Sequence, residues 1–236
     1  MRDFNSGDVV AMITKLLFNW SGGKDSALAL HELRSNGCCD VAALLTTITG
    51  DYDRVSMHGV RRTLLERQAR SIGVPLEMVY ITSHATNEEY EARMRDVLGR
   101  YKAQGVSECA FGDICLEDLR RYREEKLAQV GMKAVFPIWK RDTSELAHAF
   151  LQLGFRAVVT CVDSQALDGG FAGREYDALF LADLPASVDP CGENGEFHSF
   201  VYDGPVFREP VPFEKGEVVL RDGRFYFCDL LPKEET

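Results

Sequence analysis

A short run of small, hydroxyl-bearing and charged residues near the amino terminus has the composition of a phosphate-binding loop. Its members are contiguous: Ser21, Gly22, Gly23, Lys24, Asp25 and Ser26. Glycines let the backbone turn sharply and approach a ligand without a Cβ atom in the way. The N–H groups at the start of a helix, a lysine ammonium and two hydroxyls would then face a bound anion. These residue types at this spacing predict a site for pyrophosphate, provided that a strand precedes the run and a helix follows it.

The flanking residues predict that context. Residues 16–18 form an apolar run typical of a buried strand, and residues 24–35 follow with a helical pattern. From residue 15 to residue 163, short apolar strands alternate with helices of about 10–15 residues, which indicates a parallel sheet with helices on both faces. Ligands of such sheets bind at the carboxyl ends of the strands. We therefore expect partners of the loop after Thr47 and after Phe111.

The character of the chain changes after residue 163. The apolar run 157–162 is expected to be the last strand of the parallel series, and glycines and prolines then interrupt any long helix. Asp222 and Gly223 lie between two strand-like runs and predict a β-hairpin. We expect two unequal parts, an α/β domain over residues 1–163 and a smaller mixed α/β region over residues 164–236.

The loop sequence SGGKDS is neither a Walker A motif nor the GxGxxG of dinucleotide-binding folds. A plain strand-to-helix turn with a capping serine is the alternative to a phosphate loop. In this position SGGKDS resembles the PP-loop ATP pyrophosphatases, which split ATP between its α and β phosphates. The resemblance implies a Rossmann-like fold of the adenine nucleotide alpha hydrolase type, with ATP and Mg²⁺. It also implies that Asp25 helps to hold the metal, and helix capping is the alternative role for Asp25.

Two later segments narrow the resemblance. The first is FGDI at residues 111–114, and the second is CGENGEFHS at residues 191–199, followed by DGPVF at residues 203–207. They resemble the signature segments of the diphthine–ammonia ligase family, which forms the last amide of diphthamide on elongation factor 2. MHG at residues 57–59 and PIW at residues 137–139 also match the pattern of that family. The resemblance covers nearly the whole chain up to about the end of the second segment.

This resemblance implies an ATP-dependent ligase. Such an enzyme adenylates a carboxylate, releases pyrophosphate, and then transfers ammonia to the acyl adenylate with release of AMP. The residues that we expect to bind the nucleotide are Ser21, Gly22, Gly23, Lys24, Asp25, Ser26, Thr46, Thr47, His58 and Gly112. The residues that we expect to act in catalysis are Lys24, Asp113, Glu193 and Glu196. Helix capping is the alternative for Asp113, and exposed loop acids are the alternative for both glutamates. For the two threonines the alternative is a plain strand position.

The second segment departs from the family pattern, which reads closer to CGEGGEYET. Asn194 replaces a glycine, Phe197 lacks a tyrosine hydroxyl, and His198-Ser199 replaces a Glu-Thr pair. Because of these departures, the acceptor could be either elongation factor 2 or a small carboxylate. A non-catalytic adenine-nucleotide-binding module is a third interpretation. Because no glutaminase segment is evident, free ammonia or a partner would supply the nitrogen, and a homodimer is one assembly that we consider.

Composition excludes several other classes. The 27 basic and 37 acidic residues give a formal charge of −10, which offers no general attraction to nucleic acid. The seven cysteines show no CxxC spacing, so neither a disulfide framework nor a zinc ribbon is indicated. No apolar run approaches the roughly 18 residues of a membrane span, and no leader pattern is visible. We expect a cytoplasmic protein with reduced thiols and no membrane contact.

Overall fold

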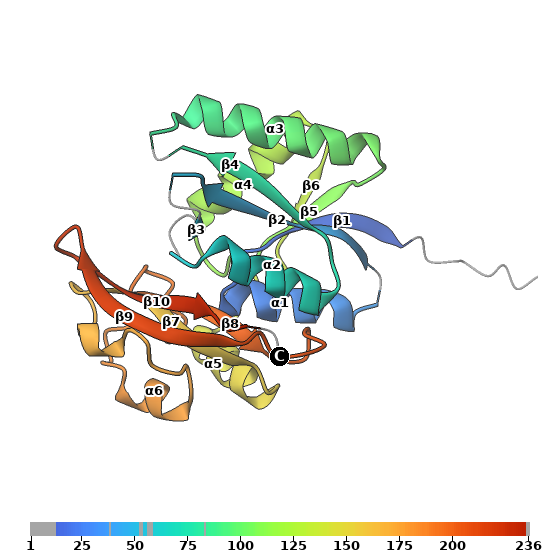
Figure 1. Cartoon of the computed structure of the whole chain (residues 1–236). Helices are drawn as coiled ribbons and strands as arrows, with labels where there is room; N and C mark the ends of the chain where they lie inside the picture. Colours follow the sequence, from blue (N-terminus) through green and yellow to red (C-terminus); the bar gives the residue numbers. More distant parts are fainter. Residues whose placement is uncertain (1–12, 38, 52–53, 56–58, 83, 235–236) are drawn as a thin grey trace, which may run out of the picture.

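The computed structural model of the chain describes residues 13–37, 39–51, 54–55, 59–82 and 84–234 (Figure 1). Its first sheet contains five parallel strands: β1 (Thr14–Asn19), β2 (Cys39–Thr49), β4 (Leu76–Ile81), β5 (Glu108–Ala110) and β6 (Lys133–Val135). The short strand β3 (Arg54–Val55) runs antiparallel to the end of β2. The predicted parallel α/β sheet is confirmed.

The order of these parallel strands positions the site. Across the sheet they run β4-β2-β1-β5-β6. The chain therefore adds β2 and β4 on one side of β1, and then β5 and β6 on the other side. The order therefore reverses between β1 and β5. At such a reversal the connections leave the two strands in opposite directions, and a crevice opens at the carboxyl ends of the strands. The glycine-rich loop follows β1, and Gly112 and Asp113 follow β5.

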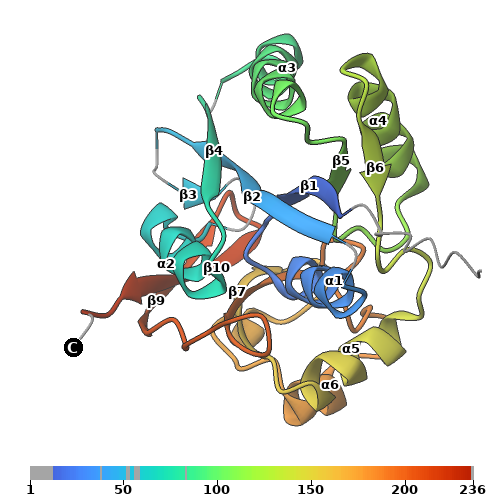
Figure 2. The same ribbon diagram turned by 90° about the vertical axis from the view of Figure 1, so that its right-hand side faces the viewer.

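Helices cover both faces of the parallel sheet (Figure 2). On one face, α3 (Asn87–Ala103) and α4 (Glu117–Gln129) pack on apolar side chains that include Leu17 and Leu45. On the other face lie α1 (Lys24–Ser35) and α2 (Arg62–Ile72). Among the described residues, no helix is long and apolar enough to cross a membrane.

The second sheet is antiparallel, in the order β8-β7-β10-β9. Its strands are β7 (Arg156–Asp163), β8 (Phe197–Asp203), β9 (Phe213–Arg221) and β10 (Phe225–Pro232). In Figure 1, α1 and α2 lie between the two sheets, and α5 (Thr143–Gln152) and α6 (Ala178–Asp183) lie beyond the second sheet. One apolar core joins β1, α1, α2, α5 and the second sheet.

One expectation about the strands is wrong. The run 157–162 was expected to close the parallel series, but it forms most of β7, between β8 and β10 of the antiparallel sheet. Every residue of β7 after Arg156 is buried. A strand covered on both faces has the same continuous apolar composition in a parallel and an antiparallel sheet, so composition does not distinguish the two. The second sheet thus begins before the boundary expected at residue 163.

The hairpin predicted at Asp222-Gly223 is confirmed between β9 and β10. Both turn residues have positive φ angles, 51° and 64°. The N–H of Arg224 donates to the carbonyl of Arg221 at 3.0 Å and closes the turn. A type I′ turn requires positive φ angles at both central residues, and the Asp-Gly pair adopts them readily.

Candidate active site

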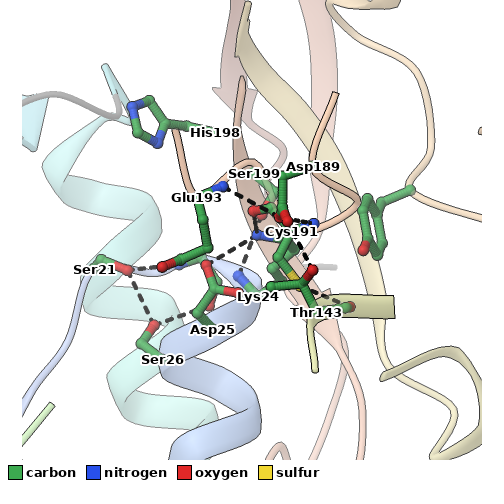
Figure 3. Close-up of polar contacts among 12 residues, drawn as sticks. Ser21, Lys24, Asp25, Ser26, Thr143, Asp189, Cys191, Glu193, His198 and Ser199 are labelled. Atoms are coloured by element: carbon green, nitrogen blue, oxygen red, sulfur yellow. Dashed lines mark hydrogen bonds and ion pairs between the residues drawn. The ribbon is translucent and has the colours of Figure 1, made fainter. Parts of the chain in front are cut away.

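A cavity of about 560 Å³ lies at the carboxyl ends of β1 and β5, where the parallel sheet meets the second sheet. Its lining residues come from segments 19–26, 112–123 and 191–199. The structure therefore brings together the glycine-rich loop and the two later segments, which are far apart in the sequence. Figure 3 shows the loop beside the segment 191–199. A smaller cavity of about 60 Å³ between α3 and α4 contains no residue of the loop.

The loop is shaped by its own hydroxyls. Gly22 turns the chain at a φ angle of 81°, a conformation that favours glycine. The hydroxyl of Ser21 accepts a hydrogen bond from the N–H of Gly23 at 3.2 Å and lies 3.1 Å from the hydroxyl of Ser26. Ser26 in turn donates to the carbonyl of Gly23 at 2.9 Å. These contacts hold the N-terminus of α1 toward the cavity, where backbone N–H groups attract anions.

Lys24 joins the loop to the segment 191–199. Its side chain is 5 % exposed, and its ammonium donates to the carbonyl of Cys191 and to Asp25 Oδ2, the latter at 2.9 Å. Its backbone N–H donates to the hydroxyl of Ser199 at 3.2 Å. Burial lowers the pKa of Lys24, but nearby groups, with the Asp25 carboxylate first among them, more than compensate, so the pKa lies above its ordinary value. The site therefore contains a fixed, buried cation.

Gly112 lies against the first turn of α1. A Cβ atom at this position would lie 2.8 Å from the Ser26 nitrogen and 2.9 Å from the Ser26 Cα. Real Cβ atoms do not approach backbone atoms so closely, and neither backbone atom can move without moving the helix. Glycine at residue 112 therefore lets β5 approach the N-terminus of α1.

The carboxylate of Asp113 is held by Arg123 from α4. Arg123 Nη2 donates to Asp113 Oδ1 at 3.1 Å, and Arg123 Nε lies 2.7 Å from Asp113 Oδ2 as an ion pair without hydrogen-bond geometry. The guanidinium also stacks over the ring of Phe111, 4.3 Å from its centroid. The capping alternative for Asp113 is wrong, because α4 begins after Leu116 without a side-chain cap.

The two glutamates of the segment 191–199 have different environments. Glu196 is 4 % exposed, and its carboxylate accepts three hydrogen bonds: from the N–H of Asp189 at 3.0 Å and from the N–H and side-chain amide of Asn194, both at 2.9 Å. Burial raises the pKa of Glu196, but these hydrogen bonds outweigh it and the net shift is downward. Glu196 does not line the cavity. Its carboxylate organises the loop from inside.

Glu193, by contrast, lines the cavity and points toward Ser21 and Asp25 (Figure 3). Its Oε2 accepts a weak hydrogen bond from the thiol of Cys115 at 3.4 Å. Burial, with the nearby Asp25 carboxylate as the second cause, raises the pKa of Glu193. A carboxylate in this position binds protons and cations more readily than an exposed one.

Models of known protein families match most of the chain. The model of the diphthamide synthase N-terminal domain matches residues 14–134, and the model of the C-terminal domain matches residues 142–227. The chain belongs to the diphthamide synthase family. The resemblance predicted from the loop and the two later segments is confirmed.

Curated relatives agree with this family. The diphthine–ammonia ligase of Schizosaccharomyces pombe is 25 % identical over 228 residues, which are 87 % of this chain and 37 % of the relative. That of Danio rerio is 24 % identical over 226 residues, 85 % of this chain and 86 % of the relative. The chain thus spans about a third of the first relative and most of the second. A solved structure, the U34-tRNA thiolase NcsA from Methanococcus maripaludis, is 16 % identical with a TM-score of 0.38, over 62 % of this chain and 59 % of that one.

Most residues predicted for the site of this diphthamide synthase family member line the cavity: Ser21, Gly23, Lys24, Asp25, Ser26, Gly112, Asp113 and Glu193. Gly22 does not line the cavity, but its positive φ angle turns the loop. Thr46 and Thr47 lie within β2, where they pair with Met78 and Val79 of β4, and neither lines the cavity. His58 lies outside the described residues.

The cavity residues that were not predicted as site residues in this family member include Arg123, His198 and Ser199. In the sequence, Ser199 and His198 are notable only as departures from the family pattern, and Arg123 belongs to no motif that predicts a site residue. Burial, helped by the Lys24 charge, lowers the pKa of His198 to about 4, so its imidazole is neutral at pH 7. Asp113 lies in the loop after β5 and Arg123 in α4, so no helical or strand periodicity in the sequence connects them.

Proposed function

We propose that this member of the diphthamide synthase family is an ATP-dependent ligase that joins ammonia to a carboxylate, with diphthine on elongation factor 2 as the acceptor. The observation that carries the proposal is the double contact of Lys24 with the segment 191–199, through the Cys191 carbonyl and the Ser199 hydroxyl. The phosphate loop and the segment most specific to the family thus form opposite walls of one cavity.

The loop supports the nucleotide half of the reaction. The N-terminus of α1 and the ammonium of Lys24 would bind the phosphates and stabilise the charge that develops on pyrophosphate as the acceptor carboxylate attacks the α-phosphorus. Mg²⁺ is usually held by one or two carboxylates together with substrate phosphates, and Asp25 would offer one such carboxylate at the cavity. When bound, the metal would neutralise phosphate charge.

The segment 191–199 supports the second half. The attacking nitrogen must be neutral, although ammonium is the main form of ammonia at neutral pH. Glu193 has a raised pKa and points into the cavity, so it would hold the ammonium ion and accept one proton from it. The ammonia formed would then attack the acyl carbon, AMP would leave, and the second proton of the nitrogen would pass to solvent. The ion pair of Asp113 and Arg123 would contribute a fixed charged wall for the acceptor.

Intact-mass analysis tests the proposal. Elongation factor 2 carrying diphthine is incubated with the protein, Mg-ATP and ammonium, and AMP and pyrophosphate are quantified in the same tube. We expect an acid-to-amide mass change that matches the AMP formed. Lys24→Met should lower the formation of both products by about 100-fold or more, whereas Lys15→Met, at an exposed position of β1, should retain it. Bound nucleotide without AMP under any acceptor would contradict the proposal and favour a binding module.

One observation favours a second candidate, a small-molecule carboxylate as the acceptor. At position 198 the cavity wall carries a neutral imidazole where the family pattern has a carboxylate, which weakens its attraction for a cationic acceptor. AMP formation with a small carboxylate, together with an unchanged elongation factor, would support this candidate.

A further inference from the structure

Gln68 is a completely buried polar side chain that lies outside the cavity. It projects from α2 and has 0 % of its surface exposed. Its amide makes three hydrogen bonds: Oε1 accepts from Trp20 Nε1 at 2.8 Å, and Nε2 donates to the carbonyls of Gly22 at 3.0 Å and Val201 at 2.6 Å. The indole can only donate and the two carbonyls can only accept, so the chemistry of the partners defines the orientation of the amide.

The hydrogen bond from Gln68 to the Gly22 carbonyl determines the orientation of the peptide between Gly22 and Gly23 in the phosphate loop. The peptide between Gly22 and Gly23 is trans, so its C=O and its N–H point in opposite directions. The carbonyl of Gly22 is turned into the core, where it accepts from Gln68 and from the N–H of Val201 at 2.9 Å. The N–H of Gly23 therefore points the other way, toward Ser21 at the cavity.

A flipped peptide would reverse this arrangement. Glycine accepts almost any backbone conformation, so Gly22 by itself does not prevent the flip. In the flipped state the carbonyl oxygen of Gly22 would face the cavity and repel phosphate. Val201 offers the second donor to this carbonyl, and its own carbonyl is held by Gln68. One donor to the Gly22 carbonyl is thus Gln68 itself, and the other is the N–H of the residue whose carbonyl Gln68 also binds.

We infer that Gln68 is a positioning residue for phosphate binding, which fixes the orientation of the peptide between Gly22 and Gly23 and couples it to β8. The strand β8 carries Val201 and, two residues earlier, Ser199, whose hydroxyl accepts from the N–H of Lys24. Gln68 therefore aligns the loop with the second wall of the cavity without touching a ligand. The inference rests on the proposed function, since it requires that the loop binds phosphate.

The test compares a ligand with phosphates and a ligand without them. Affinities of the full chain for inorganic pyrophosphate with Mg²⁺, and for adenosine, are measured by calorimetry for wild type and Gln68→Met. Gln68→Met keeps the length of the side chain but not its hydrogen bonds. We expect pyrophosphate affinity to fall by about tenfold or more, while adenosine affinity stays within about twofold. Gln129→Met, at an exposed position of α4, should match wild type.

Each other outcome is decisive. Equal losses for both ligands, or unchanged pyrophosphate affinity in a folded Gln68→Met protein, would overturn the inference and leave the proposed function intact. A wild-type protein that binds no pyrophosphate would overturn both. If Gln68→Met does not fold, Gln68→Glu replaces it, because glutamate keeps the acceptor for Trp20 and loses the amide donors. The same selective loss for pyrophosphate is expected of that variant.

Discussion

The loop of residues 21–26 and the segment of residues 191–199 face each other across the cavity, but different kinds of contact hold them. In the loop, the hydroxyls of Ser21 and Ser26 bond to partners within five positions along the chain. The second wall depends on remote groups: the Cys191 thiol donates to the carbonyl of Thr143 at 3.3 Å, and Ser199 accepts from Lys24. The hydroxyl contacts of the loop therefore depend on local sequence, whereas these contacts of the second wall require distant parts of the chain to be in place.

Lys24 belongs to both walls, so its replacement should have the largest effect. For Lys24→Met we expect kcat/KM for AMP formation to fall by about 100- to 1,000-fold, the loss typical of removing one preorganised charge-stabilising donor. The measurement is steady-state AMP release, with Lys15→Met as the control. Retention of activity within about tenfold of wild type would show that this ammonium does not stabilise the pyrophosphate.

Gly112→Ala tests the approach of β5 to the loop. A methyl group 2.8 Å from the Ser26 nitrogen must displace the backbone, and overpacking of this kind costs about 1–3 kcal/mol of unfolding free energy. We also expect ATP affinity to fall by about tenfold. Gly99→Ala is a matched control inside α3, where no atom lies within 4 Å of the new methyl group, and it should add about 0.5–1 kcal/mol of stability. Chemical denaturation and calorimetry measure both.

In the second wall, we expect Glu193 to affect turnover and Glu196 to affect stability. Glu193→Gln should lower acceptor-dependent turnover by about tenfold with little change in stability, because its carboxylate faces the cavity. Glu196→Gln should instead lower the unfolding free energy by about 1–3 kcal/mol, since an amide cannot accept the same three N–H donors. Equal effects of the two changes on turnover would contradict this division.

The effect of Glu196 on stability should also depend on pH. The pKa of its carboxyl is lowered in the folded protein, so its stabilisation is complete above the ordinary value of 4.5. That stabilisation is lost as the pH falls through the lowered pKa. The stability difference between wild type and Glu196→Gln should therefore shrink below about pH 4.5, as urea titrations over a pH series would measure.

Ser199 should give the smallest effect. Ser199→Ala removes one neutral acceptor from the N–H of Lys24, which corresponds to about 1 kcal/mol and a rise of about fivefold in KM for ATP. Ser199→Thr keeps the hydroxyl and restores the residue of the family pattern, so its KM should match wild type. A KM for Ser199→Ala that equals that of Ser199→Thr would show that the contact between the walls does not affect nucleotide binding.

The same contrast explains which features the sequence predicts. The loop is contiguous and flanked by a clear strand and helix, so its place in the fold could be predicted, and alternating elements predicted the parallel sheet. The different roles of Glu193 and Glu196 could not be predicted, because the sequence of an irregular loop does not indicate which side chain is buried and which lines the cavity. The role of Gln68 could not be predicted either. It binds Gly22, 46 residues away in the sequence, and the pattern of its helix predicts only which face is buried.

The placement of α1 between the two sheets has a consequence for how the protein folds and unfolds. Seven of the twelve residues of this helix are buried, and five of them belong to one apolar core that reaches from β1 to the second sheet. Neither sheet can separate from α1 without exposing that core to water. We therefore expect the regions matched by the two family models to unfold together in a single melting transition, so that a cavity made in this core under either sheet lowers the thermal stability of both.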